Sequence, residues 1–94
     1  MLIRIVKMSF KPEQAAHFLQ LFNQRRHLIA GFAGCRGVEL LRDIDNPDIF
    51  FTYSRWDNET HLNLYRESDL FKEVWSTVKP WFNDKPQAWS VNQL

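Results

Sequence analysis

The sequence predicts an α+β fold in which one four-stranded antiparallel sheet carries helices on one face. Three observations predict it: four strand-like runs interleave with helical patterns, turn signals separate them, and the chain has 94 residues. We expect a chain of this length to form one domain, 1–94, and to bury roughly 60–65% of its unfolded surface. Because 45% of the residues are hydrophobic and 15% aromatic, part of the apolar surface is expected in an interface or a pocket.

The first predicted strand is 2–10, in which Arg4 and Lys7 interrupt the apolar residues and leave both faces mixed. Pro12 suits the first turn of a helix, where its missing N–H would have no helical partner. Apolar residues then recur at helical spacing until Gly31, which we expect to cap the helix. This helix is expected to lay three apolar side chains on the sheet: Phe18, Phe22 and Ile29.

The second and third predicted strands form a hairpin. The second is Cys35–Arg42 and the third, rich in aromatic residues, is Ile49–Trp56. Between them, Asp43, Asp45, Asn46 and Pro47 give a dense turn signal.

Two helical pieces are predicted after the hairpin. Asp57 or Asn58 can cap the first, because either side chain can accept a hydrogen bond from a free amide of the first turn. Ser68 interrupts the pattern and can cap the second piece, which runs to about residue 79 and ends before Pro80. The predicted inward positions are Leu62, Tyr65, Phe71, Val74 and Val78.

The last predicted strand is 87–93, and it completes the ferredoxin-like βαββαβ order. Helices can cover only one face of such a sheet, so the other face needs a second cover, and a two-fold-related copy of the chain is the simplest source. Both alternate sets of strand residues contain aromatic side chains, and the sequence does not decide which set faces the helices. The proposed uncovered set is Ile3 or Val6 with Phe51, Tyr53 and Trp89, and both Trp81 and Trp89 are candidate interface anchors.

Charge and composition argue against nucleic-acid and membrane binding. Twelve basic residues nearly balance eleven acidic ones, for a formal net charge of +1, and no clustered basic face is evident. No apolar stretch approaches the ~20 residues of a membrane span. The single cysteine, Cys35, cannot form an internal disulfide, and the first residues lack the pattern of a signal peptide. We therefore expect a cytoplasmic protein.

Two stretches, 53–60 (YSRWDNET) and 65–71 (YRESDLF), resemble the antibiotic-biosynthesis-monooxygenase-like family. The shared features are a strand that ends in Trp, a polar cap, a short helix, and then a Ser and an aromatic residue that open the next helix. The resemblance implies a dimeric α+β barrel with a pocket between sheet and helices in each subunit. It also implies one of several activities, among them cofactor-free oxygenation of polycyclic aromatic compounds, haem degradation and isomerisation.

The chain departs from the family pattern at positions that matter for chemistry. Many members have a His where this chain has Tyr65, and another where it has Leu70. The haem-degrading branch has an Asn on the first strand, a Trp near position 65 and a His near position 75, whereas this chain has Trp75 there and no Asn in its first strand. Without an axial His, haem degradation is not expected. The resemblance implies a protein without a cofactor.

The resulting hypothesis is a cofactor-independent monooxygenase-like protein that binds a small hydrophobic or aromatic compound. Such an enzyme removes a proton from its substrate so that the anion can pass an electron to O₂, which requires a dry aromatic pocket, a base and a group that stabilises negative charge. His61 and Tyr65 share a helix face at i, i+4: His61 is the candidate base, and Tyr65 could donate to a substrate oxygen. The alternative is a solvated His61 and a core Tyr65.

Large rings predict where a flat ligand would bind. Trp56, Phe71 and Trp75, with Trp81, could line a slot for it, although ordinary packing explains the same residues. One of three charged strand residues, Arg4, Lys7 or Arg55, could contact an anionic substrate or stabilise an enolate, and Arg55 is the predicted substrate-binding residue among them.

The alternative for Arg55, as for Arg4 and Lys7, is a cross-strand ion pair or a sheet-edge position. No metal site is predicted, because the chain has no His-x-x-x-His, no Cys pair and no tight carboxylate cluster. The competing hypothesis for the whole chain is a non-catalytic homodimeric binding or accessory module, for which the missing family histidines argue.

Overall fold

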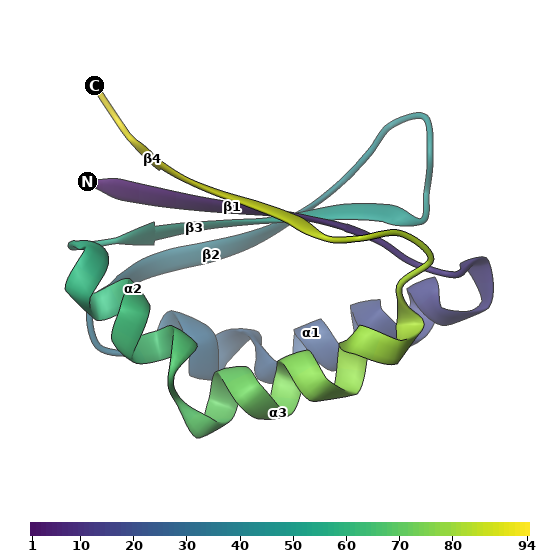
Figure 1. The fold of residues 1–94 in the computed structure, drawn as a ribbon, viewed down its shortest axis with the longest axis horizontal. Helices are drawn as coiled ribbons and strands as arrows, with labels where there is room; N and C mark the ends of the chain where they lie inside the picture. The colour runs from purple at the N-terminus through teal and green to yellow at the C-terminus, as the bar shows by residue number, and fades with distance from the viewer.

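The computed structural model describes residues 1–94 as a two-layer α+β fold, with all helices on one face of a single antiparallel sheet (Figure 1). The strands lie in the order β2-β3-β1-β4, and they are β1 (Leu2–Ser9), β2 (Cys35–Arg42), β3 (Ile49–Trp56) and β4 (Gln87–Asn92). The helices are α1 (Ala15–Ala30), α2 (Glu59–Arg66) and α3 (Asp69–Val78), with short 3₁₀ turns at Pro12–Gln14 and Lys79–Trp81. The predicted ferredoxin-like βαββαβ fold is confirmed, and the sheet of one chain is open, with β2 and β4 at its edges.

Pro12 and Gly31, the residues predicted to begin and end α1, differ in part from their predicted roles. Pro12 opens a 3₁₀ turn, and the α-helix begins only at Ala15. Gly31 ends the helix as predicted, and its N–H donates to the His27 carbonyl at 3.0 Å. Its φ of −85° is right-handed, however, and the left-handed residue of this loop is Gly34, with φ of +84°.

Side-chain caps begin α2 and α3. Of the two candidate caps for α2, the structure uses Asn58, whose side chain accepts from the His61 N–H at 3.0 Å. Asp57 instead accepts from Arg36 at 2.6 Å. Ser68 caps α3, as predicted, by accepting from the Phe71 N–H at 3.1 Å.

Strand register decides which side chains meet the helices. Met8 lies opposite Phe50, and Val6 opposite Thr52. This alternate set forms the helix-facing side of the sheet, so Val6, which the sequence left open for the uncovered face, lies under the helices. The main core cluster consists of Met8, Phe10, Ala15, Phe18, Phe22, Ile29, Val38, Phe50 and Val78. The predicted inward residues of α1, Phe18, Phe22 and Ile29, are all buried there.

The opposite side of the sheet, here called the open face, has no helix over it (Figure 1). Ile5 lies at its centre, paired with Tyr53 on one side and Trp89 on the other. Ile3 and Phe51 belong to the same alternate set. Trp89 is 44% exposed in the single chain, and two further residues, Leu41 and Val91, are 45% and 43% exposed.

Trp81 does not share this face. It lies at the end of the 3₁₀ turn after α3, packs against the main core cluster, and has its ring centroid 6.0 Å from that of His17. The predicted role of Trp81 as an interface anchor therefore has no support from the open face, and it stays a prediction. None of the helices has the length and hydrophobicity that crossing a lipid bilayer requires.

Candidate functional site

A cavity of about 340 Å³ lies between the sheet and the helices. It falls within the size range of small-molecule pockets. Nineteen residues line it, of which thirteen are hydrophobic. The sheet contributes the floor, and α2 and α3 contribute most of the opposite wall through Leu62, Tyr65, Phe71, Val74, Trp75 and Val78.

Phe71 and Trp75 give this wall flat aromatic surface. They lie one turn apart on α3, and their rings are stacked with centroids 5.8 Å apart and planes inclined by 9°. The Ser68 cap fixes where α3 begins and so which of its faces meets the sheet. Both rings were predicted to contact a ligand, and both line the cavity.

The Tyr65 ring lies between Trp56 and Phe71 and contacts both. It stacks on Trp56 at a centroid distance of 5.0 Å and meets Phe71 edge-on at 5.4 Å. Burial raises the pKa of the Tyr65 hydroxyl well above its ordinary value, because the phenolate loses its hydration. The hydroxyl therefore stays protonated, so it can donate a hydrogen bond but cannot serve as a base near neutral pH.

Trp56 lies behind Tyr65 and does not line the cavity. Its side chain is completely buried, and its indole N–H donates to the Ser54 hydroxyl at 2.9 Å. With Leu2 and Leu62 it forms a second, smaller core cluster. The structure therefore places Trp56 as support for the Tyr65 ring.

His61 and Arg55 also lie outside the cavity lining. The His61 ring packs on Gly34, and its Nδ1 is the only buried side-chain nitrogen or oxygen without a hydrogen-bond partner. Arg55 lies on the open face, 3.5 Å from the Glu39 carboxylate, which is the cross-strand pair that the sequence offered as the alternative. Of the six predicted site residues, the cavity brings together Tyr65, Phe71 and Trp75.

Gly34→Ala is expected to lower the free energy of unfolding by at least about 2 kcal/mol. The backbone is left-handed at this position, and an added Cβ would overlap the His61 ring. Urea denaturation measures the loss. The double variant Gly34→Ala/His61→Ala should recover little of it, because alanine keeps the His61 Cβ, which the added Cβ would also overlap. An unchanged unfolding midpoint in the single variant would contradict this packing.

Two arginines belong to the site: Arg4, which the sequence offered as one of three possible contacts for an anion, and Arg66, which sequence reasoning missed. Arg4 on β1 and Arg66 in the last turn of α2 both line the cavity, and with Tyr65 they are its only ionisable side chains. Arg4 donates to the Ser90 hydroxyl at 2.9 Å. Burial, and then the charge of Arg66, lower the pKa of the Arg4 guanidinium. Arg4 carried a signal, as a charge within an apolar strand, whereas Arg66 had none.

The lining contains no carboxylate and no histidine. Elsewhere in the chain, no three His, Cys, Asp or Glu side chains lie together in a way that could hold a metal ion. The polar lining is limited to the two arginines, the Tyr65 hydroxyl and three uncharged side chains: Thr52, Ser54 and Gln87.

Comparison with known structures finds the same fold in other proteins. A candidate antibiotic biosynthesis monooxygenase of Nitrosomonas europaea superimposes with a TM-score of 0.93 at 18% identity, over 100% of this chain and 99% of that one. A conserved protein of Methanosarcina mazei gives 0.91 at 23% identity, over 100% and 94%. A candidate antibiotic biosynthesis monooxygenase of Bordetella bronchiseptica gives 0.87 at 26% identity, over 99% and 96%.

Comparison with curated proteins finds no match. Residues 1–75 match the sequence model of a family described as antibiotic biosynthesis monooxygenase. These residues carry β1 to β3, α1, α2 and most of α3, and hence both arginines and all three aromatic side chains of the site. The chain belongs to the antibiotic biosynthesis monooxygenase family.

Proposed function

We propose that this protein is a cofactor-independent monooxygenase-like protein that binds a small aromatic compound between Trp75, Phe71 and the sheet. The supporting observation is the cavity of about 340 Å³ with thirteen hydrophobic lining residues and two stacked rings in its wall. Aromatic rings offer a large contact area with little loss of conformational entropy on binding. Family membership favours oxygenation as the chemistry.

The proposed reaction begins with an ionised substrate. Its anion transfers one electron to O₂, the two radicals combine at carbon to give a hydroperoxide, and loss of water leaves a ketone. The balance is one CH₂ group and one O₂ to one C=O group and one H₂O. Since no carboxylate or histidine lines the cavity, the substrate has to be acidic enough to lose its proton to water. The protonated Tyr65 hydroxyl then donates to the substrate oxygen.

In this proposal His61 takes no part in proton transfer. Its ring is held against Gly34, so the i, i+4 spacing that suggested a pair with Tyr65 does not bring it to the cavity. The second candidate function, a binding module without catalysis, is favoured by the same absence of a base from the lining. Oxygen consumption separates the two functions.

With anthrone as substrate, we expect the native protein to consume one O₂ per molecule and to release anthraquinone and water. Trp75→Ala should raise KM roughly 10-fold because one stacking surface is lost. An oxygen electrode and absorbance spectroscopy measure both quantities.

His61→Ala is the matched control and should keep the native kinetic constants. If His61→Ala folds normally but no longer turns over anthrone, the assignment of His61 to packing is wrong. If the native protein binds anthrone without consuming O₂, the binding module is the better description.

We also propose that two copies pair through the open face. Its central residue Ile5 and the exposed Trp89, Leu41 and Val91 form an apolar surface on a sheet that has no other cover. The loop between β2 and β3 rises on the same side of the sheet (Figure 1), and Ile44 in it is 96% exposed. A stable dimer typically buries about 800 Å² per partner, and such pairing would close the two open sheets into the dimeric α+β barrel that the family resemblance implies.

A further inference from the structure

Arg4 and Arg66 adjoin the cavity without a counter-charge. The three ion pairs of the chain use other arginines: Arg25 with Glu73, Arg36 with Asp57, and Arg55 with Glu39. No acidic residue lines the cavity. Two guanidinium groups therefore lie at the edge of a mostly apolar space with nothing in the chain to neutralise them.

Arg4 has hydrogen-bonding capacity to spare. A guanidinium carries five N–H donors, and Arg4 uses Nη1 in a bond to Ser90 at 2.9 Å. Arg4 is half-buried, and its lowered pKa reports that burial and the nearby Arg66 both disfavour its charge. An anion between the two side chains would offset both effects, because it replaces lost hydration and screens the repulsion between them.

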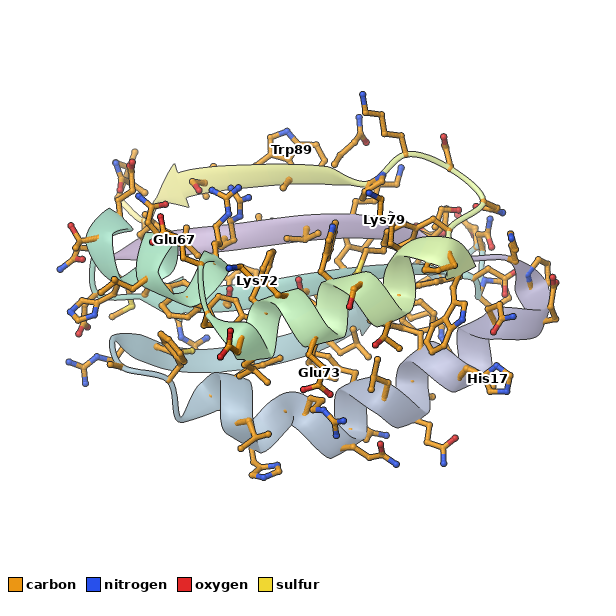
Figure 2. The ribbon with its side chains drawn as sticks, turned by 60° about the horizontal axis from the view of Figure 1, so that its bottom comes forward. His17, Glu67, Lys72, Glu73, Lys79 and Trp89 are labelled. Atoms are coloured by element: carbon orange, nitrogen blue, oxygen red, sulfur yellow. The ribbon has the colours of Figure 1, made fainter.

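The surroundings of the cavity add positive charge. Figure 2 shows Lys72 and Lys79 along the edge of α3 that faces β4, whereas Glu73 points toward α1, where it binds Arg25 at 2.8 Å. Glu67, the acidic residue that follows α2, is exposed and does not line the cavity. Lys72 and Lys79 therefore add positive charge along this edge of α3.

We propose that the cavity takes its aromatic compound as an anion, with a carboxylate or ionised phenol oxygen held by Arg4 and Arg66 and the rings against Phe71 and Trp75. This inference rests on the proposed function and narrows its substrate class to aromatic acids and acidic phenols. Guanidinium groups suit such a ligand because their N–H donors match two oxygens at once. For an ionised phenol or enol, whose negative charge is shared with the reacting carbon, this stabilisation also favours loss of the proton to water in a lining that has no base.

The test compares 2-naphthoate with its neutral counterpart 2-naphthamide by isothermal titration calorimetry. The native protein is expected to bind the acid roughly 10-fold or more tightly than the amide. Arg4→Gln and Arg66→Gln should each weaken naphthoate binding roughly 10- to 100-fold and change naphthamide binding by less than about twofold. Arg26→Gln is the matched control, since it removes the same charge from an exposed position of α1.

The outcomes separate the two proposals. If the native protein binds neither compound, the aromatic cavity itself is wrong, and this inference falls with it. If it binds both equally well, the cavity stands and the anion site is overturned. Circular dichroism checks the folding of each variant. If Arg4→Gln does not fold, the test relies on Arg66→Gln, because the Arg66 side chain is exposed and its replacement should not affect folding. Unchanged naphthoate binding in Arg66→Gln then overturns the inference.

Discussion

Ile5→Asp is expected to separate the proposed dimer into folded monomers. Ile5 is at the centre of the open face, paired with Tyr53 and Trp89. In the dimer each new carboxylate would be buried without a partner, which costs several kcal/mol per charge. The dissociation constant should therefore rise at least about 1000-fold. Sedimentation velocity at micromolar concentration measures the change in mass.

Leu64→Asp is the matched control for this prediction. Leu64 is 53% exposed on α2, in the helix layer away from the open face. The same new charge there should leave the dimer intact. A native protein that sediments as a monomer at micromolar concentration would refute the dimer. An Ile5→Asp variant that stays dimeric would show that the interface lies on another surface.

Phe10→Ala is expected to lower the free energy of unfolding by about 3–5 kcal/mol. Phe10 is 0% exposed, and its ring stacks on Phe18 at 4.4 Å and contacts Phe50 and Phe82 at 5.9 and 5.2 Å. Its truncation removes these contacts and leaves a void where β1 meets α1. Since the free energy of unfolding of a domain is only about 5–15 kcal/mol, this single change should remove a large fraction of the stability of the protein.

Equilibrium urea denaturation of the native protein and the variant measures this loss. Leu64→Ala, at an exposed position, should change stability by no more than about 0.5 kcal/mol. A loss below about 1 kcal/mol for Phe10→Ala would contradict the packing, because it would mean that the surrounding rings close the void.

The elements of the fold were predictable because their signals are local. The dense turn before Pro47 and the alternating runs on either side gave the bounds of β2 and β3 to the residue. The face assignment was not predictable, because both alternate sets contain aromatic residues. It follows from register: Met8 and Phe50 are paired beneath the helices, whereas Ile5 and Tyr53 are paired on the other side.

The candidate site was predictable only in part, for a similar reason. Helical spacing placed Tyr65 and Phe71 on inward faces, and Trp75 was predicted from its large ring; all three line the cavity. The same spacing could not show that the loop carrying Gly34 meets the His61 ring, since that contact joins segments far apart in sequence. Arg66 escaped notice because a basic residue in the last turn of a helix is ordinary.

Two adjacent residues of β1, Arg4 and Ile5, lie on opposite faces of the sheet. Successive side chains of a strand point in opposite directions, so Arg4 reaches the cavity while Ile5 belongs to the open face. A second copy seated on Ile5 would restrict the backbone that also aims the Arg4 guanidinium. Dimerisation and ligand binding would then be thermodynamically linked. The factor by which dimerisation raises the affinity for the ligand equals the factor by which the ligand raises the affinity between the two copies.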